Sequence, residues 1–215
     1  MPRIVCISDT HNCHSSLAVP LGDVLIHSGD ATINGTEEEI LTFSNWFRHL
    51  PHRRKIFVAG NHDRLFEDDL DRARQFLGRE VVYLQDCVAA IDGLRIYGSP
   101  WQPRFFDWAF NRNRGPEMAE VWSKIPADID ILITHGPPFG ILDEVERPGG
   151  MENAGCEELL RKIAEIIHFG RLRLHIFGHI HAGHGTKVFD DMTFVNASIC
   201  DEEYRPIQKA IVVEL

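Results

Sequence analysis

The sequence lacks the long hydrophobic runs and the paired cysteines that mark two large classes of protein. No stretch of about 18 consecutive apolar residues occurs, so no membrane-spanning helix is predicted. The five cysteines are scattered and none belongs to a Cys-x-x-Cys pair, which argues against a disulfide framework and against a cysteine zinc site. Residues 4–7 already form an apolar run with no signal-peptide pattern before it, and we therefore expect a cytoplasmic protein.

Positive charge is also scarce. The chain has 22 lysines and arginines against 32 aspartates and glutamates, which leaves a formal net charge of −10. Because a protein that tracks a nucleic-acid backbone needs a basic surface, no nucleic-acid tracking is expected. Acidic residues that bind a metal still count in this formal charge, so the protein loaded with metal would be less acidic than its sequence.

What the sequence does contain is the composition of a globular domain. Apolar residues make up 44% of the chain and charged residues 25%, both near the average for such domains. A chain of 215 residues can bury a sizeable core, and a single domain covering residues 1–215 is the simplest interpretation. Predicted strands and helices mix along the whole chain, which indicates an α/β fold.

Five apolar runs of strand length each end at a cluster of polar residues. The runs cover residues 4–8, 24–28, 55–59, 129–134 and 174–177. The clusters that follow them are Asp9-Thr10-His11, Gly29-Asp30, Gly60-Asn61-His62-Asp63, His135-Gly136 and Gly178-His179-Ile180-His181. Since ligands gather beyond the carboxyl ends of the strands in open α/β sheets, we expect these clusters to lie together.

Helices are predicted between the strands by apolar residues at helical spacing. The first begins after Thr36, a candidate N-cap with Glu39 three residues later in the capping-box arrangement, and Pro51 ends it. Further helices are expected over residues 69–77, 117–124 and 156–168, and short strands over 81–84, 88–91, 94–97, 193–195 and 209–214. The Gly- and Pro-rich segment between His135 and Cys156 is expected to be a loop.

The polar clusters supply eight side chains with O or N donors suited to binding a metal: Asp9, His11, Asp30, Asn61, His62, His135, His179 and His181. Imidazole, carboxylate and amide donors without a thiolate suit first-row divalent metals such as Mn, Fe, Co, Ni or Zn. These are too many donors for one tetrahedral ion, whereas two ions that share a bridging carboxylate would use them well. Each cluster alone is a weak signal, because an Asn-His-Asp turn is more often a hydrogen-bonded loop than an active site.

Taken in order, the five clusters resemble the signature of the calcineurin-like metallophosphoesterases. That signature runs D-x-H, G-D, G-N-H-D/E, a His after Gly or Thr, and G-H-x-H, and the resemblance extends over nearly the whole chain. Residues 98–103, 111–115 and 135–138 are similar to the branch of animal metallophosphoesterase-domain-containing proteins. The resemblance implies a four-layer α-β-β-α metallophosphoesterase sandwich of two mixed sheets flanked by helices.

The same resemblance implies two divalent metal ions, with Mn expected first and Fe, Zn, Co or Ni as alternatives. The ligands of one ion would be Asp9, His11, Asp30 and His181. Those of the second would be Asn61, His135 and His179, with Asp30 as the bridge.

Two residues of the third cluster are similar to the family's catalytic groups. His62 resembles the catalytic histidine that binds no metal, and Asp63 is expected to fix its orientation. Alternatively, Asp63 caps the next helix. One departure concerns substrate recognition, because Ile33 stands three positions after Asp30, where many relatives have a charged residue.

The implied reaction is phosphodiester hydrolysis, with attack by a metal-activated hydroxide and with His62 as general acid. Since the related branch is associated with cyclic nucleotides, the expected substrate is a small phosphodiester or nucleotide. A protein phosphatase or nuclease of the same chemistry is an alternative, for which the acidic balance gives no support. A non-catalytic interaction scaffold of the same fold is a second alternative, against which the presence of His62 beside every expected ligand argues.

Residues 101–114 form a long predicted loop rich in aromatic residues and arginine, and two interpretations of it stay open. Its rings would stack on a nucleobase while Arg112 or Arg114 meets a phosphate. Alternatively, the rings pack the loop onto its own domain. Histidines outside the clusters are expected at the surface or in the core: His27, His49, His52, His168, His175 and His184.

Overall fold

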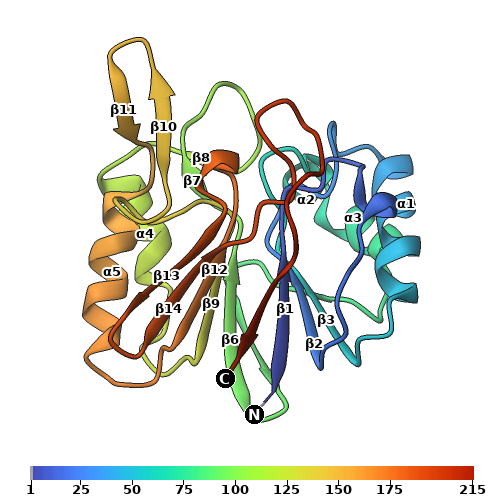
Figure 1. Ribbon diagram of the computed structural model, residues 1–215, viewed down its shortest axis with the longest axis horizontal. Helices are drawn as coiled ribbons and strands as arrows, with labels where there is room; N and C mark the ends of the chain where they lie inside the picture. Colours follow the sequence, from blue (N-terminus) through green and yellow to red (C-terminus); the bar gives the residue numbers. More distant parts are fainter. Residues whose placement is uncertain (1) are drawn as a thin grey trace.

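Two β-sheets pack face to face in the centre of the protein, and helices cover the outer face of each sheet (Figure 1). This computed structural model describes residues 2–215. Both sheets mix parallel and antiparallel strands. The four-layer α-β-β-α sandwich implied by the family resemblance is therefore confirmed.

The first sheet is parallel except at one edge. Its strands are, in spatial order, β15 (Ile211–Glu214), β1 (Arg3–Ile7), β2 (Val24–His27), β3 (Arg54–Phe57) and β4 (Val82–Tyr83). β15 runs antiparallel to β1, and the other neighbours are parallel. Its outer face carries α1 (Glu37–His49), α2 (Leu65–Asp68) and α3 (Leu70–Leu77) (Figure 1).

The second sheet has four parallel central strands between antiparallel edges. Its order is β13 (Gly185–Phe189), β14 (Met192–Asn196), β12 (Leu174–Phe177), β9 (Ile131–Thr134), β6 (Leu94–Ser99) and β5 (Cys87–Ile91). Its outer face carries α4 (Pro116–Ser123) and α5 (Glu157–Ile167) (Figure 1). Among residues 2–215, no helix is long and apolar enough to cross a membrane.

Strand β1 shows how one sequence serves two cores. Ile4 and Cys6 belong to the core between the sheets, whereas Val5 and Ile7 point into the core between sheet and helices. Successive side chains of a strand face opposite ways, and here both faces are buried, so the strand is a continuous apolar run. This double burial explains why the central strands are readable from the sequence.

Several strands are present that the sequence pattern does not predict. The segment expected as a loop after His135 contains the hairpin of β10 (Glu144–Arg147) and β11 (Gly150–Asn153), which projects from the body of the protein (Figure 1). Within residues 101–114, β7 (Gln102–Pro103) and β8 (Asn111–Arg112) form a short parallel pair. The residues of β10, β11 and β13 are mostly exposed, so these strands have no alternation of apolar residues to reveal them.

The predicted capping box at the start of α1 is confirmed. The main-chain N–H of Glu39 donates to the Thr36 hydroxyl (3.3 Å), and the main-chain N–H of Thr36 donates to the Glu39 carboxylate (2.9 Å). The same carboxylate accepts a hydrogen bond from the side-chain amide of Asn12 (2.6 Å). The cap therefore also ties α1 to the loop that follows β1.

Removing this cap should destabilise the protein. We expect Thr36→Ala to lower the free energy of unfolding by about 1 kcal/mol, because an N–H group of the first turn loses its acceptor. Urea unfolding measures the change. Thr42→Ala, which removes an exposed hydroxyl from the middle of the same helix, is the matched control and should cost much less. Equal losses in the two variants would contradict the capping role.

Candidate metal centre

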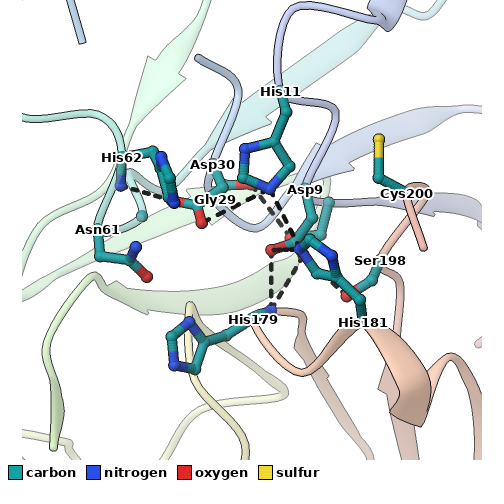
Figure 2. A network of polar contacts seen from close by, with 12 residues as sticks. Asp9, His11, Gly29, Asp30, Asn61, His62, His179, His181, Ser198 and Cys200 are labelled. Carbon is teal, nitrogen blue, oxygen red and sulfur yellow. Dashed lines mark hydrogen bonds and ion pairs between the residues drawn. The ribbon is translucent and has the colours of Figure 1, made fainter. Parts of the chain in front are cut away.

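The predicted donors lie together where the carboxyl ends of the two sheets meet, and Figure 2 labels all of them except His135. Asp9 follows β1 and Asp30 lies beyond β2 in the first sheet, whereas His135 follows β9 in the second. A single β-bridge between Ser8 and Ser198 joins the two sheets beside Asp9. The packing of the sheets therefore brings donors from both of them to one place.

The glycines of the motifs are required because the donors approach the main chain closely. A side chain at Gly60 would collide with the carboxylate of Asp30, and one at Gly178 would collide with that of Asp9. Positive φ angles between 39° and 68° occur at four of the donors themselves: Asp9, His11, Asp30 and His179. Left-handed backbone at such residues costs about 1–3 kcal/mol each and is concentrated at functional sites.

Three of the donor imidazoles are oriented by the same kind of contact, a hydrogen bond from Nδ1 to a main-chain carbonyl. The three bonds are His11 to Thr32 (3.3 Å), His135 to Ser28 (3.1 Å) and His181 to Asp201 (2.8 Å). Because Nδ1 donates in each case, Nε2 is the nitrogen left to bind a ligand. Histidines that bind metals are held in this way.

Asp9, His11 and His181 form the first cluster of donors. The Nε2 atoms of His11 and His181 are 3.2 Å apart, and Nε2 of His181 lies 3.5 Å from Oδ1 of Asp9. Asp9 is held in turn by the main-chain N–H of His179 (3.0 Å) and by the hydroxyl of Ser198 (2.9 Å). Two lone pairs that face each other this closely require a proton or a cation between them.

Asp30, His135 and His179 form the second cluster, with Asn61 beside it. Nε2 of His135 lies 3.4 Å from Oδ2 of Asp30 and 2.9 Å from Oδ1 of Asn61. The same oxygen of Asp30 is 3.9 Å from Nε2 of His11, which belongs to the first cluster. Asp30 therefore lies between the two clusters, where a bridging carboxylate is expected.

The four donor imidazoles fall into two pairs by their protonation. Burial lowers the pKa of His11 to about 4 and that of His179 to about 3, so both are neutral at pH 7. Burial also acts on His135 and His181, but the carboxylates that adjoin them outweigh it and raise the pKa of each to about 9. Protons on these two imidazoles thus provide the positive charge that a cation would otherwise supply.

The donor set fits two divalent ions of the first transition row. The seven donors that the resemblance assigns to the metal ions are oxygen or nitrogen atoms of buried or half-buried side chains. They form two clusters, and Asp30, which belongs to the second, also lies within reach of His11 and of His62. Carboxylate and imidazole donors in this proportion are typical of such metals. The residues present are therefore suited to hold the metal ions implied by the sequence.

The expected contact between Asp63 and the ring of His62 is not made. The buried carboxylate of Asp63 accepts hydrogen bonds from the main-chain N–H groups of Gly60 (2.8 Å), Ala31 (3.3 Å) and Thr32 (3.0 Å) and from the Thr32 hydroxyl (2.7 Å). Within residues 2–215, none of its hydrogen bonds comes from His62, and it does not cap α2. Burial, together with a neighbouring carboxylate, raises the pKa of Asp63 to about 6. Asp63 instead fastens the loop after β2 to the loop after β3.

Other groups hold the ring of His62. Its Nδ1 donates to the main-chain carbonyl of Ile33 (2.7 Å), the ring of His11 meets it edge-on, and the indole of Trp108 covers one face. The side chain reaches the wall of a cavity, so Nε2 is the ring nitrogen available there. Ile33 acts through its main chain, and its departure from the charged residue of many relatives does not affect this contact.

A cavity of about 440 Å³ opens over the donors. Its walls include Arg104 and Phe105 from the loop after β7, Arg147 from the β10–β11 hairpin, and Tyr204 from the loop before β15. The cavity therefore combines the metal-binding groups with cationic and aromatic side chains from three separate segments.

The two interpretations of residues 101–114 apply to different parts of that loop. Trp101 and Phe110 are buried and pack onto the domain, and the guanidinium of Arg112 stacks over the Trp101 ring at 3.7 Å. Arg114 lines the cavity, but it donates to a glutamate of α5 and to main-chain carbonyls. Phe105 remains half-exposed at the cavity, as a ring that meets a ligand would be.

The remaining histidines lie in the core or at the surface, as predicted. His27 and His175 are fully buried, and each is hydrogen-bonded to a threonine of a motif, Thr10 at 3.0 Å and Thr134 at 2.8 Å. Both histidines therefore hold a motif residue in place through a hydrogen bond, and neither is one of the predicted donors.

Ser198 and Tyr204 also contact the predicted donors, although no motif in the sequence points to them. The hydroxyl of Ser198 donates to Asp9, and the ring of Tyr204 lies 4.6 Å from that of His11, centroid to centroid. Both residues follow the last motif, and no local pattern marks them. They reach the site because the chain returns to it after β14.

Comparisons with known proteins identify the family of the chain. The family model for calcineurin-like phosphoesterases matches residues 2–183. Metallophosphoesterase domain-containing protein 1 of Homo sapiens is 42% identical, over 99% of this chain and 71% of that protein. A UPF0046 protein of Caenorhabditis elegans is 40% identical, over 95% of this chain and 73% of that protein. A Staphylococcus aureus protein described as a candidate 5′-nucleotidase shares the fold with a TM-score of 0.52 at 12% identity, over 90% of this chain and 48% of that one.

Metal binding should release protons and should strengthen as the pH rises. In the metal-free protein His135 and His181 are protonated below about pH 9, and each must lose its proton to bind a cation. We expect the apparent affinity for Mn to rise by about tenfold per pH unit for each proton released between about pH 6 and pH 8. Calorimetric titration in buffers of different ionisation enthalpy counts these protons. An affinity that does not change with pH would contradict the assignment.

Proposed function

This chain belongs to the calcineurin-like phosphoesterase family, and we propose that it is a dinuclear metal-dependent phosphodiesterase that acts on small nucleotides. One observation carries the proposal. Asp30 adjoins both clusters of donors, and His62, which lies within reach of Asp30 and His11, lines the cavity with one ring nitrogen not bound to the main chain. The arrangement combines sites for positive charge with a separate group that can transfer a proton.

The two clusters would each hold one ion. Asp9, His11 and His181 would serve the first, and Asn61, His135 and His179 the second, with Asp30 between them. When bound, such ions supply Lewis-acid charge and an activated water molecule. The contribution of the chain is to aim Nε2 of each oriented imidazole inward, since the main-chain carbonyls occupy Nδ1.

His62 would donate a proton to the leaving oxygen. Its Nδ1–H is bound to the carbonyl of Ile33, so Nε2 can carry and deliver a proton when the ring is an imidazolium. The main-chain N–H of His62 donates to Oδ1 of Asp30 at 2.8 Å. This bond fixes the position of the acid relative to the carboxylate shared by the two clusters.

The cavity supports a substrate of nucleotide size. Its volume of about 440 Å³ suits a small molecule better than an extended protein or nucleic-acid strand. Arg104 and Arg147 can pair with phosphate oxygens, and the rings of Phe105 and Tyr204 can contact a base. The formal charge of −10 gives no support to a nuclease.

Loss of the proposed acid should separate metal binding from turnover. We expect His62→Ala to bind Mn as the wild type does but to lose turnover by about 10²–10⁴-fold on a diester with a poor leaving group. Calorimetry and steady-state kinetics measure the two properties. His49→Ala, at an exposed position on α1, is the control and should change neither. Comparable rates for His62→Ala and the wild type would exclude His62 as the acid.

A substrate screen tests the proposed class directly. With Mn added, we expect cyclic nucleotides and other phosphodiesters to be hydrolysed faster than phosphomonoesters, because the proposal assigns the site to diesters. Initial rates at matched substrate concentrations provide the comparison. A preference for monoesters would overturn the proposed substrate class. Absence of both metal binding and turnover after incubation with Mn would favour a scaffold instead.

A further inference from the structure

We propose that Trp108 is a positioning residue for His62, and that its indole holds the imidazole in the orientation that proton transfer needs. The two rings are in tilted face contact, with centroids 4.0 Å apart and planes inclined by 32°. This inference rests on the proposed function, in which His62 protonates the leaving oxygen. It assigns a role to the part of the 101–114 loop that neither the metal clusters nor the cavity explains.

The loop that carries Trp108 is fastened directly to the motif that carries His62. The main-chain N–H of Ala109 donates to the carbonyl of Asn61 (3.2 Å), and the guanidinium of Arg64 donates to the carbonyl of Asp107. The main-chain N–H of Phe110 donates to a carboxylate oxygen at the end of α2 (2.7 Å). Three hydrogen bonds with the main chain of residues 107–110 therefore hold the indole next to the imidazole that it covers.

The loop is also rigid in itself. The buried side chain of Asn111 accepts a hydrogen bond from the main-chain N–H of Phe105 (3.0 Å) and donates to the carbonyls of Phe106 (3.0 Å) and Trp108 (2.8 Å). One amide group thus fixes the curvature of the whole segment. The bond from Asn111 uses the main chain of Trp108 and not its indole, and the Trp108 side chain is only partly buried.

Trp108 restrains the ring of His62 differently from its other contacts. The hydrogen bond from Nδ1 to Ile33 fixes one ring atom, and His11 meets the ring edge-on with centroids 4.8 Å apart. The ring of Tyr204 is also nearly perpendicular to the imidazole, with centroids 6.1 Å apart, so Trp108 is the one of these three aromatic neighbours whose plane lies closest to that of the imidazole. Trp108 covers one face, and a displacement of about 1 Å of a catalytic group can cost about 10²-fold in rate.

The first test measures the ring itself and needs neither metal nor turnover. In proton NMR spectra of the metal-free protein, the indole should shift the ring protons of His62 upfield. We expect this shift to be lost in Trp108→Leu and largely kept in Trp108→Phe, which retains an aromatic face. Phe106→Leu, at an exposed aromatic position of the same loop, is the control and should leave the shift unchanged. A shift that persists in Trp108→Leu would overturn the proposed contact.

The second test compares leaving groups in the Mn-loaded protein. A 2′,3′-cyclic nucleotide expels a ribose alkoxide that needs a proton, whereas bis-p-nitrophenyl phosphate expels a phenolate that scarcely does. We expect Trp108→Leu to lower kcat by about 10- to 100-fold for the cyclic nucleotide and by less than about 3-fold for the nitrophenyl ester. KM should change little for either substrate, and Trp108→Phe should recover most of the lost kcat.

The outcomes separate this proposal from the proposed function. An equal loss of kcat on both substrates would show a general structural role and would overturn the positioning role. A wild-type protein without phosphodiesterase activity would overturn the proposed function, and the NMR comparison would still decide whether Trp108 holds the ring. Thermal unfolding of each variant shows whether a loss of kcat comes from unfolding of the protein. If Trp108→Leu is unfolded, the comparison of Trp108→Phe with the wild type tests the positioning role.

Discussion

Four imidazole rings at the centre of this protein are held by one interaction, a hydrogen bond from Nδ1 to a main-chain carbonyl. The carbonyls belong to Ser28, Thr32, Ile33 and Asp201. A carbonyl is fixed by the backbone, so each ring keeps a proton on Nδ1 and has one orientation, with Nε2 left for chemistry. Three of the four carbonyls lie in residues 28–33, and the geometry of the centre therefore depends mainly on the segment after β2.

Two carboxylates keep that segment in place. Asp63 accepts hydrogen bonds from main-chain N–H groups of residues 31–32, and Glu39 accepts them from residues 33–34. Glu39 therefore both caps α1 and holds Ile33, the residue whose carbonyl orients His62. Burial and the neighbouring carboxylate of Asp30 raise the pKa of Asp63 to about 6, because the charged form loses its hydration and meets a like charge. Support of the site is therefore distributed among residues that do not themselves reach the cavity.

The central strands could be predicted because burial on both faces shows directly in their composition. β1, β2, β9 and β12 are apolar in the sequence apart from Arg3, His27, Thr134 and His175, and the polar residues that follow them mark the edge where the donors meet. The exposed strands β10, β11 and β13 could not be predicted, because nothing selects apolar residues on a face that stays in water. For the same reason, the part of the cavity wall formed by the β10–β11 hairpin could not be predicted from the sequence.

The sequence by itself determined the inventory of donors, the strand ends that carry them and the glycines that let them approach the backbone, because these are local requirements of short motifs. Only the tertiary structure decided which group contacts which. Asp63 bonds the segment after β2 and not His62, Trp108 covers His62, and Tyr204 arrives from the last loop. These contacts join residues remote in the chain, and their distances depend on how two sheets pack and on how loops are anchored, which no local pattern specifies.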